Sequence, residues 1–355
     1  METEIIRIDT NTPSWQNKLD YPAQVLKSGG LVAFPTETVY GLGANAFDEN
    51  ALEGIYKAKG RPSDNPLIVH VADIGQISDL VGKMPSIAKK LIEAFWPGPL
   101  TLIMPKSDKV PSKITAGLDT VAVRMPSNAI ALELIKKSGV PVAAPSANSS
   151  GKPSPTMADH VIRDLSGKVD IIIDGGSTNV GVESTVLDIT VDPPVILRPG
   201  GVTKEQLQWV LGEVSQDVSP SSTSAKAHPR SPGMKYRHYA PNAVLLLVQG
   251  CPERVAEEIS KRAELYNNEG NYVGVLTTDE SASLYETELY AFCKVLSLGS
   301  KKHPESLAAN LFKRLREFDE AGVDVILAEA PDTNGIGQAV MNRLVKASSG
   351  NIIKL

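Results

Sequence analysis

The order of apolar runs in the first 212 residues restricts the folds open to this chain. Short apolar segments typical of β-strands alternate there with amphipathic stretches typical of helices. In two regions, 100–125 and 169–197, strand candidates follow one another with no helix between them. Parallel β-α-β winding would require a crossover helix at each of those steps. The pattern therefore predicts an α/β fold in which helices pack on a mixed sheet.

Each predicted element of this first domain, residues 1–212, has a residue range. The strand candidates are Leu31–Phe34, Leu67–Val71, Leu100–Met104, Thr120–Met125, Val140–Ala144, Val169–Asp174, Thr185–Ile189 and Val195–Leu197. The helical patterns cover Glu49–Ala58, Pro85–Ala94, Asn128–Lys137, Met157–Leu165 and Lys204–Leu211. The first set consists of short apolar runs and the second of amphipathic stretches.

After Ala243 the alternation becomes regular, which predicts a second domain over residues 243–355. Its strand candidates are Val244–Val248, Tyr272–Leu276, Phe292–Leu298 and Val323–Ala328, and its helical patterns are Glu253–Tyr266, Pro304–Ala321 and Ile336–Lys346. Strands separated by helices of this length predict a smaller, doubly wound, Rossmann-like domain. Because no Gly-x-Gly-x-x-Gly follows the first strand, the pattern does not indicate dinucleotide binding.

The segment 213–242 between these domains has a different composition. Its first half is rich in serine and lacks periodicity, which is typical of a linker. Its second half, Ser231-Pro-Gly-Met-Lys-Tyr-Arg-His-Tyr-Ala-Pro241, carries consecutive cationic and aromatic side chains. A passive tether is poor in such side chains. We therefore expect this half to lie over a polar, anionic ligand.

Composition excludes several classes of protein. A chain of 355 residues exceeds what one core usually supports, so two domains are expected. The net charge of −5 argues against a protein that mainly coats nucleic acid. The two cysteines, Cys251 and Cys293, have neither metal-ligand nor redox spacing, as expected in a reducing cytosol. No apolar run is long enough for a membrane span and no signal peptide is visible, so we expect a cytoplasmic protein.

The segment Lys57-Ala-Lys-Gly-Arg-Pro-Ser-Asp-Asn-Pro66 combines three cations with two prolines directly after a helical pattern. Proline fixes its own φ and restricts the residue before it, so Arg61 and Asn65 have constrained backbones. Fixed cations suit a polyphosphate or a planar carboxylate. A solvated helix end with cations near the negative pole of the dipole explains the segment equally well.

Several strand ends are followed by glycines with polar or cationic side chains. These loops are Pro35–Gly43, Ala144–Ser154, Gly175–Thr185 and Arg198–Gly201. Ligands of α/β proteins tend to bind at such places, although one loop alone is explained by turn chemistry. Arg124 ends an apolar strand, where burial favours a ligand carboxylate or phosphate as its partner, with a structural Asp or Glu as the alternative. His70 also ends a strand, and a lone histidine there is more often structural.

Familiar catalytic groups are missing from the sequence. It contains no Gly-x-Ser-x-Gly elbow, no metal-ligand spacing, no Walker A loop and no cysteine placed for attack. The loops offer cations and hydroxyl groups instead of a nucleophile with its base. Phosphoryl and nucleotidyl transfers need little else, because positioning and charge stabilisation supply most of the rate.

Taken in order, the motifs resemble the two-domain form of the YrdC-type threonylcarbamoyl-AMP synthase family over essentially the whole chain. The matching motifs are Lys59-Gly-Arg61, Ser146-Ala-Asn148, Pro35-Thr-Glu-Thr-Val-Tyr-Gly41, the linker motif 231–241 and Ala339-Val-Met-Asn-Arg343. The resemblance implies a twisted mixed-sheet catalytic domain with a concave, positively lined cavity. It also implies a nucleotidyltransferase that makes threonylcarbamoyl-AMP and pyrophosphate from L-threonine, ATP and bicarbonate or CO2.

Site residues follow from the same resemblance, position by position. L-Threonine would be held by Thr38, His70, Arg124, the Ala144 backbone and Ser184. ATP would be held by Arg61, Asn65, Thr120, Ser146, Ser154 and Arg198, with Lys59 and Asn148 near the phosphates and Tyr236 or His238 of the linker closing over the cavity. Lys59 and Arg61 would neutralise developing charge as the catalytic residues.

The resemblance further implies the reaction's other participants. Mg²⁺ would accompany the ATP, with no protein metal cage and no organic cofactor. The product would pass to a tRNA threonylcarbamoyl transferase complex that forms N6-threonylcarbamoyladenosine at position 37 of tRNAs reading ANN codons, so contact with tRNA itself would be weak or indirect. Two alternatives remain: a module that binds double-stranded RNA without ATP turnover, and a transferase or hydrolase acting on carbamoyl phosphate.

Overall fold

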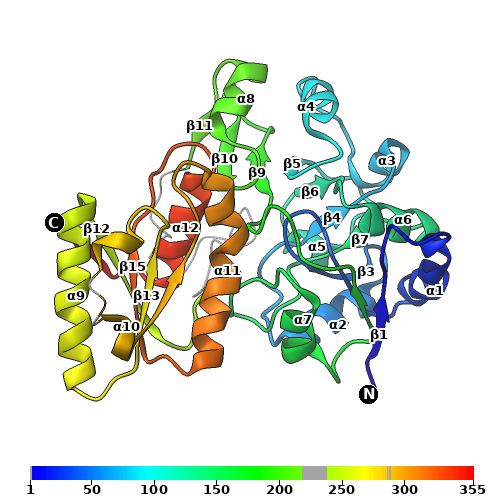
Figure 1. Ribbon diagram of the computed structural model, residues 1–355. Helices are drawn as coiled ribbons and strands as arrows, with labels where there is room; N and C mark the ends of the chain where they lie inside the picture. The colour runs from blue at the N-terminus through cyan, green and yellow to red at the C-terminus, as the bar shows by residue number, and fades with distance from the viewer. Residues whose placement is uncertain (1, 218–237, 286, 288) are drawn as a thin grey trace. The chain divides into compact units, whose positions relative to one another are not determined.

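The structure is a computed structural model that describes residues 2–217, 238–285, 287 and 289–355. The chain forms two compact units, coloured by residue number in Figure 1. The first unit falls within Met1–Ser150 and Ser154–Tyr236, and the second comprises Gly151–Pro153 and Arg237–Leu355. Most of the predicted linker, 218–237 with Tyr236, lies outside the described residues.

The first unit is built on a mixed sheet of 11 strands in the order β1-β8-β2-β3-β7-β4-β6-β5-β9-β10-β11. The strands are β1 (Glu4–Arg7), β2 (Val32–Phe34), β3 (Gly41–Asn45), β4 (Ile68–His70), β5 (Leu100–Pro105), β6 (Thr120–Arg124), β7 (Val142–Ala143), β8 (Ile171–Asp174), β9 (Thr185–Asp188), β10 (Val195–Arg198) and β11 (Ser215–Gln216). β5 pairs antiparallel with β6, and β9 pairs antiparallel with β10. The mixed sheet predicted from the missing crossover helices is therefore confirmed.

Helices cover both faces of this sheet. They are α1 (Asp20–Lys27), α2 (Glu49–Lys59), α3 (Ile77–Leu80), α4 (Ala88–Phe95), α5 (Ser112–Thr115), α6 (Ala129–Ser138), α7 (Ala158–Leu165) and α8 (Lys204–Leu211). Successive strand residues face opposite sides, so Val32 and Phe34 join a core with α1 and α6. Ala33 joins the larger core with α2, α4 and α7.

Capping residues set both ends of α2, the helix that leads into the cationic segment Lys57–Pro66. The Asp48 side chain caps its first turn by accepting from the backbone N–H groups of Asn50 and Ala51. Gly60, with φ of 62°, ends the helix in the left-handed conformation. Because the helix stops there, the chain turns directly after Lys59 and exposes the following Arg-Pro segment to the loops described below.

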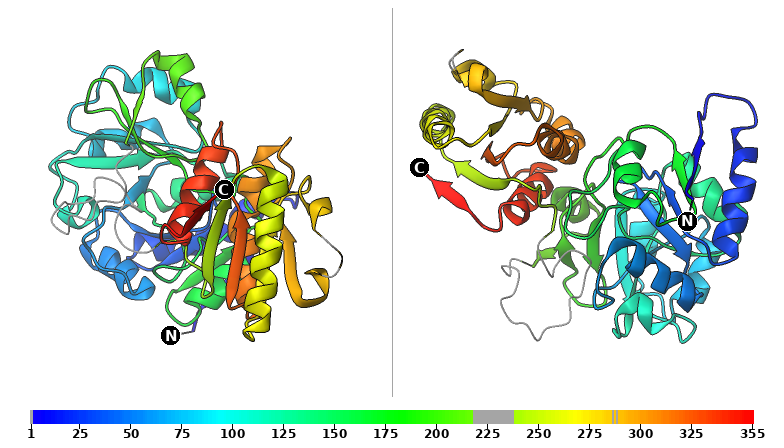
Figure 2. Two further views of the ribbon diagram at one scale, coloured as in Figure 1. Left: turned by 90° about the vertical axis from the view of Figure 1, so that its left-hand side faces the viewer. Right: turned by 90° about the horizontal axis from the view of Figure 1, so that it is seen from below.

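The second unit is a parallel sheet of 5 strands in the order β14-β13-β15-β12-β16. Its strands are β12 (Val244–Gln249), β13 (Val273–Thr277), β14 (Cys293–Ser297), β15 (Val325–Glu329) and β16 (Ile352–Lys354), and its helices are α9 (Pro252–Asn268), α10 (Leu289–Phe292), α11 (Pro304–Ala321) and α12 (Gly337–Ala347). α9 and α10 pack on one face, while α11 and α12 cover the other (Figure 2). This is the doubly wound arrangement that the sequence predicts.

Several elements were not expected from the sequence. In the first unit they are β1, β3, β11, α1, α3 and α5, and in the second they are α10 and β16. Phe292 belongs to α10, so the strand predicted to begin there starts at Cys293. Within the described residues, no helix combines the length and apolarity needed to cross a bilayer.

In the second unit, Tyr239 anchors the part of the predicted linker that the structure describes from His238 onward. Its ring stacks on Phe312 of α11 with centroids 5.3 Å apart, and the Arg343 guanidinium carbon lies 5.3 Å from the ring centre. Arg343, on α12, is fully buried. Tyr239 has φ of 64°, an uncommon conformation for a residue with a side chain. Two helices therefore hold this point of the chain in a fixed conformation.

Candidate functional site

Three of the polar loops predicted from the sequence interlock through backbone hydrogen bonds. The Tyr40 N–H donates to the Pro155 carbonyl, and the Ala147 N–H donates to the Tyr40 carbonyl, each at 2.8 Å. The Val180 N–H donates to the Glu37 carbonyl, also at 2.8 Å. These bonds join the loop after β2 to the loops after β7 and β8. Their polar side chains therefore belong to one region of the first unit.

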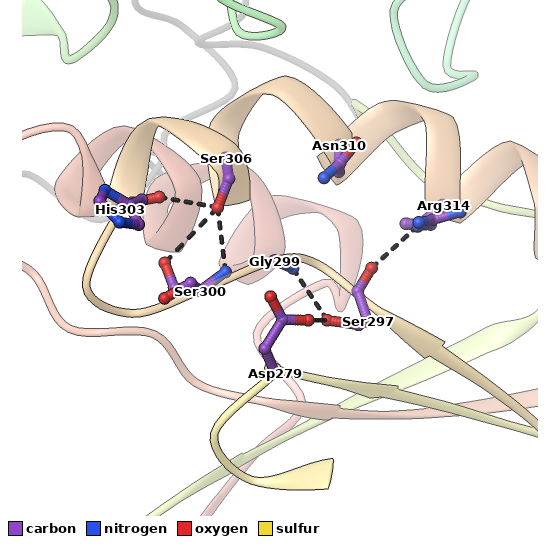
Figure 3. Close-up of a pocket in the computed structure, with 8 residues that line it drawn as sticks. All are labelled: Asp279, Ser297, Gly299, Ser300, His303, Ser306, Asn310 and Arg314. Carbon is purple, nitrogen blue, oxygen red and sulfur yellow. Dashed lines mark hydrogen bonds between the residues drawn. The ribbon is translucent and has the colours of Figure 1, made fainter.

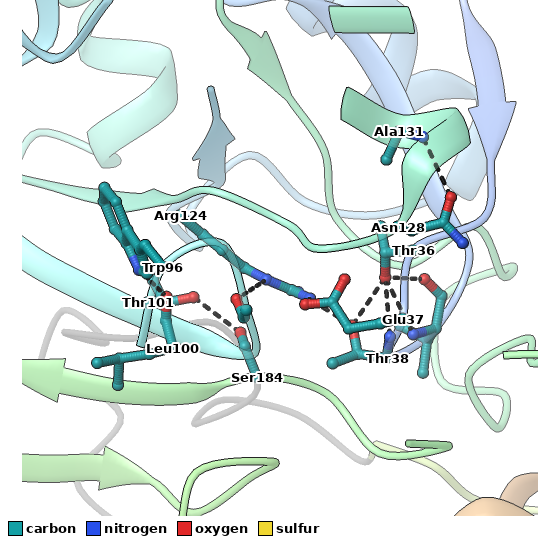
Figure 4. A network of polar contacts seen from close by, with 12 residues as sticks. Thr36, Glu37, Thr38, Trp96, Leu100, Thr101, Arg124, Asn128, Ala131 and Ser184 are labelled. Carbon is teal, nitrogen blue, oxygen red and sulfur yellow. Dashed lines mark hydrogen bonds and ion pairs between the residues drawn. The ribbon is translucent and has the colours of Figure 1, made fainter. Parts of the chain in front are cut away.

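Arg124, at the end of β6, lies at the centre of a buried polar network (Figure 4). Its Nε donates to the Gly98 carbonyl at 3.2 Å, and its Nη1 donates to the Thr38 hydroxyl at 3.0 Å. Its Nη2 lies 2.7 Å from Glu37 Oε1, and both side chains of this ion pair are buried. The sequence favoured a ligand anion as the partner of Arg124, whereas in the structure the partner is Glu37, the alternative kind.

His70 is adjacent to Arg124 because parallel strands β4 and β6 pair these two residues directly. Burial, reinforced by the Arg124 charge, lowers the pKa of His70 to about 3. The imidazole is therefore neutral near pH 7. Its Nδ1 is buried and makes no hydrogen bond to any described residue, so it can still accept or donate one to a ligand.

Arg198, at the end of β10, holds the residue that precedes β9. Its Nε and Nη2 donate to the Ser184 carbonyl at 3.1 and 3.0 Å. The Ser184 hydroxyl lies 2.8 Å from that of Thr101. The chain passes very close to Ser184 again at Gly200, where an added Cβ would lie 2.3 Å from the carbonyl oxygen of Glu183. Glycine is therefore required there for space.

Lys59 connects the Lys-x-Arg motif with the Ser-x-Asn motif. Its buried ammonium donates to the carbonyl oxygens of Ser146 and Asn148 at 2.5 and 2.6 Å. The Ser146 hydroxyl donates to the Asn148 side chain at 2.6 Å. The two motifs, 87 residues apart in sequence, thus form one cluster. In this structure Lys59 fixes the shape of the loop as well as adding positive charge.

Arg61 and Asn65, the residues that precede the two prolines of the segment Lys57–Pro66, contact each other. Arg61 Nη2 donates to the Asn65 carbonyl at 3.3 Å. The Asn65 side chain is buried, yet neither its oxygen nor its nitrogen has a hydrogen-bond partner among the described residues. Burying an unsatisfied amide is unfavourable, so this side chain is suited to a polar ligand.

The other candidate residues are placed as follows. Ala144 is buried and its N–H donates to the Ile68 carbonyl at 2.9 Å, while Thr120 begins β6 and is half-buried. The Ser154 hydroxyl donates to the buried Glu183 carboxylate. His238 belongs to the second unit, where its ring centre lies 5.7 Å from that of Tyr239. Tyr236 lies outside the described residues, so its predicted contact with nucleotide stays a prediction.

Two carboxylates in these loops were not singled out from the sequence. Glu37 pairs with Arg124, and Glu183 accepts from Ser154. Glu37 lies within the matched motif Pro35–Gly41, and Glu183 lies in the polar loop Gly175–Thr185. Membership of those segments was the available signal, but it does not reveal that the two carboxylates are buried.

The second unit has a pocket of its own, of about 410 Å³, beyond the carboxyl ends of β13 and β14 (Figure 3). It is lined by Asp279, Ser297, Gly299, Ser300, His303, Ser306, Asn310 and Arg314. These groups largely bond to one another: Ser297 donates to Asp279, and Arg314 Nε donates to the Ser297 carbonyl at 2.8 Å. None of the residues that match the family motifs lines it.

Comparison with known proteins agrees with this geometry. Residues 24–200 match the family model described as "Telomere recombination", and residues 202–349 match "Threonylcarbamoyl-AMP synthase, C-terminal domain". The curated threonylcarbamoyl-AMP synthase of Bacillus subtilis is 52% identical over 98% of this chain and 96% of its own length. That of Pyrococcus abyssi is 50% identical over 99% of this chain and 100% of its own.

A solved structure is also similar over the full length. The crystal structure of P. abyssi Sua5 complexed with L-threonine superposes with a TM-score of 0.92 at 50% identity, covering 99% of this chain and 100% of that one. Both units therefore have counterparts in a single relative. The chain belongs to the threonylcarbamoyl-AMP synthase family, in its two-domain form.

Proposed function

We propose that this protein is a nucleotidyltransferase that makes threonylcarbamoyl-AMP from L-threonine, ATP and bicarbonate or CO2, with release of pyrophosphate. The observation that carries the proposal is the interlocking of the loops that bear Thr38, Ser146 and Ser184. The buried cations Lys59, Arg124 and Arg198 are each hydrogen-bonded to one of these loops. A region rich in fixed positive charge is suited to a triphosphate and a carboxylate together.

The amino-acid side of the site is built around Arg124. A buried guanidinium suits a substrate carboxylate, and Thr38 and the neutral His70 next to it offer hydrogen bonds to a side-chain hydroxyl. The relative from P. abyssi has been crystallised with L-threonine. We propose that threonine binds here through Thr38, His70, Arg124, the Ala144 backbone and Ser184.

The nucleotide side comprises the Lys59 and Arg61 clusters. The unsatisfied Asn65 amide supports a polar ligand at this place. We propose that ATP binds through this region, with its phosphates near the two cations. The proposed nucleotide-binding set is Lys59, Arg61, Asn65, Thr120, Ser146, Asn148, Ser154 and Arg198, together with Tyr236 or His238 of the linker.

The transfer step needs charge stabilisation more than it needs a protein nucleophile. The carbamate oxygen of N-carboxythreonine would attack the α-phosphorus of ATP, forming one O–P bond as the bond to the pyrophosphate oxygen breaks. Arg61 would stabilise the charge that develops on the α-phosphate, and Lys59 would hold the Ser146 loop in place while adding its own charge.

Magnesium would enter this site on the triphosphate. No group of three or more His, Cys, Asp or Glu side chains suited to a metal occurs among the described residues. Mg²⁺ is usually held by substrate phosphates with few protein ligands, so the residues present fit that role. The ion would neutralise charge on the leaving pyrophosphate.

The product is a reactive mixed anhydride, so we propose that it passes to a tRNA threonylcarbamoyl transferase complex. That complex would form N6-threonylcarbamoyladenosine at position 37 of tRNAs reading ANN codons. This enzyme's own contact with tRNA would be weak or indirect. The net charge of −5 is consistent with that division.

One assay tests the function against both alternatives. Pyrophosphate release from ATP is measured with threonine and bicarbonate each omitted in turn. Release that requires both co-substrates supports the synthase. Binding to double-stranded RNA with no ATP turnover would instead support the RNA-binding module, and consumption of carbamoyl phosphate without ATP or threonine would support the carbamoyl transferase or hydrolase.

A further inference from the structure

Glu37 is a buried carboxylate that the proposed reaction does not yet use. Its side chain is only 9% exposed, and its Oε1 lies 2.7 Å from Arg124 Nη2. The N–H bonds of Arg124 do not point along that line, so neither oxygen of Glu37 accepts an aligned hydrogen bond from a described residue. A buried carboxylate with so few donors is expensive, and a cationic ligand would relieve that penalty.

The backbone holds Glu37 in place on both sides. The Val180 N–H donates to the Glu37 carbonyl at 2.8 Å, and the Gly181 N–H donates to the Thr38 carbonyl at 3.1 Å. The Thr36 hydroxyl closes the turn by donating to the Val39 carbonyl at 2.6 Å. Figure 4 shows the Glu37 carboxylate at the tip of the Arg124 guanidinium. The carboxylate is therefore preorganised beside the cation.

Charge balance indicates which ligand suits this pair. Arg124 and Glu37 carry opposite charges and sum to zero. An α-amino acid is a zwitterion, so its carboxylate can meet Arg124 while its ammonium group meets Glu37, and no net charge enters the buried site. A 2-hydroxy acid of the same shape would bring one uncompensated negative charge next to Glu37.

We propose that Glu37 binds the α-ammonium group of the amino-acid substrate and so selects an α-amino acid over a 2-hydroxy acid. This inference rests on the proposed function, since it assumes that the amino acid binds at Arg124. Glu37 would also hold the nitrogen, the atom that must later be carboxylated, in a defined place next to the carboxylate site.

The competing explanation is that Glu37 only orients Arg124. The two roles differ in a measurable way. An orienting residue affects every ligand that uses Arg124, whatever group it carries at the α-carbon. An ammonium-binding residue affects only ligands that have the ammonium group. A matched pair of ligands therefore separates the roles.

The experiment measures calorimetric binding of L-threonine and of (2S,3R)-2,3-dihydroxybutanoate, in which a hydroxyl replaces the ammonium group, to the full chain. We expect the wild type to bind threonine about 10- to 100-fold more tightly, the range for a charge-assisted hydrogen bond. In Glu37→Gln this preference should fall to about threefold or less, through loss of threonine affinity by a similar factor of about 10–100.

Two controls accompany the variant. ATP affinity should be unchanged in Glu37→Gln, because the proposal assigns Glu37 no contact with nucleotide. Glu329→Gln removes a buried carboxylate in the second unit and should leave both ligand affinities as in the wild type. Should Glu37→Gln fail to fold, Glu37→Asp keeps the charge but shortens its reach, and it should weaken threonine more than the hydroxy acid.

Other results would overturn the inference. If Glu37→Gln weakens both ligands equally, Glu37 merely orients Arg124. If it weakens neither, or if the wild type shows no preference for threonine, no ammonium site exists at Glu37. If the wild type binds neither ligand while ATP still binds, the proposed threonine site fails and this inference fails with it. If Glu37→Gln still binds threonine and keeps the wild-type preference for it over the hydroxy acid, this inference fails while the proposed threonine site stands.

Discussion

Each unit of this chain buries a glutamate beside a cation, and the surroundings of the two differ. Glu329, at the end of β15, accepts hydrogen bonds from Thr277 at 2.6 Å and Tyr285 at 2.7 Å, with Lys301 Nζ 3.9 Å away. Glu37, similarly buried, has one partner among the described residues, the Arg124 guanidinium at 2.7 Å. The second unit thus surrounds Glu329 with hydroxyl donors, whereas the first unit leaves Glu37 without an aligned donor among the described residues, although it supplies one to Glu183.

The difference separates structural burial from burial that awaits a ligand. A carboxylate whose oxygens already accept hydrogen bonds from hydroxyl groups stabilises the fold and can bind few further donors from a ligand. One that lacks donors costs stability until something binds. Asn65 and His70, which also hold buried polar atoms without partners among the described residues, lie in the same unit as Glu37. The predictions that follow test whether this contrast holds.

Breaking the Arg124–Glu37 pair should have the largest effect. Arg124→Met leaves the Glu37 charge buried and uncompensated, so the free energy of unfolding should fall by about 3–5 kcal/mol. Urea unfolding measures it. The double variant Arg124→Met/Glu37→Gln should recover most of that loss without recovering threonine binding. Equal stability of the single and double variants would contradict the pairing.

Arg61→Ala is the matched control for ligand binding. It should abolish or strongly weaken ATP binding and leave threonine binding nearly intact, because Arg61 donates to the Asn65 carbonyl, whereas Arg124 bonds to Gly98 and Thr38 and pairs with Glu37. Calorimetry with each ligand alone gives both affinities. Similar loss of both ligands in the Arg61 and Arg124 variants would refute this division of labour.

Glu329→Gln should destabilise without affecting ligands. The amide offers one acceptor oxygen where the carboxylate serves three hydroxyl groups, those of Thr277, Thr278 and Tyr285, and lies near Lys301. We therefore expect a loss of about 1–3 kcal/mol in the free energy of unfolding. Thermal unfolding of the variant measures it. Threonine or ATP affinity that changed more than about twofold, beyond the effect of stability, would show that the second unit's network is not purely structural.

The buried imidazole of His70 makes stability depend on pH. Burial lowers its pKa from 6.5 to about 3, whereas in the unfolded chain it returns to about 6.5. Between these values the unfolded chain binds a proton that the folded chain does not, so stability falls as pH falls, by about 1.4 kcal/mol per unit. From pH 6.5 to 5, the wild type should lose about 2 kcal/mol more than His70→Gln. If the free energy of unfolding fell equally with pH in the two proteins, His70 would not be a neutral buried imidazole in the folded state.

The smallest effects concern two buried or half-buried amides. Asn65→Ala should change the free energy of unfolding by less than about 1 kcal/mol, because no described residue bonds its amide, yet it should weaken ATP about 3- to 10-fold. Asn310→Ala, which loses a 2.9 Å hydrogen bond to the Leu298 carbonyl, should cost about 1 kcal/mol and leave ATP affinity unchanged. If Asn65→Ala lost more stability than Asn310→Ala, or if Asn310→Ala weakened ATP binding, the contrast between the two units would be contradicted.

Much of the fold could be predicted from the sequence because local signals agree with it. α8 and α11 have the predicted bounds, since a capping box at Thr203 starts one and Gly322 in the left-handed conformation ends the other. For β3, by contrast, the sequence does not predict a strand, because Gly41–Asn45 contains no β-branched residue and begins within the predicted loop Pro35–Gly43. Gly43 lies there because an added Cβ would come 2.7 Å from the Phe34 ring, a tertiary requirement that local propensity does not reveal.

The candidate site was predictable in its residue types but not in its pairings. A motif match identified Lys59, and the place of Arg124 at the end of an apolar strand identified Arg124. Their partners are nevertheless distant in sequence, because Thr38 is 86 residues from Arg124 and Asn148 is 89 from Lys59. Burial decides whether Glu37 is a solvated loop residue or part of a charged pair, and burial depends on how three loops pack. No pattern within one loop contains that information.

Gly200 shows how little tolerance such packing leaves. Its backbone passes so close to Ser184 and its neighbours that even one methyl group would collide with main-chain atoms at 2.3–2.4 Å. Main chain cannot rotate aside as a flexible side chain can, so substitution would displace Ser184, just before β9, from Arg198 at the end of β10. In a saturation library of this codon screened for folded protein, we expect glycine alone to be recovered, because every other residue adds at least the Cβ that collides here.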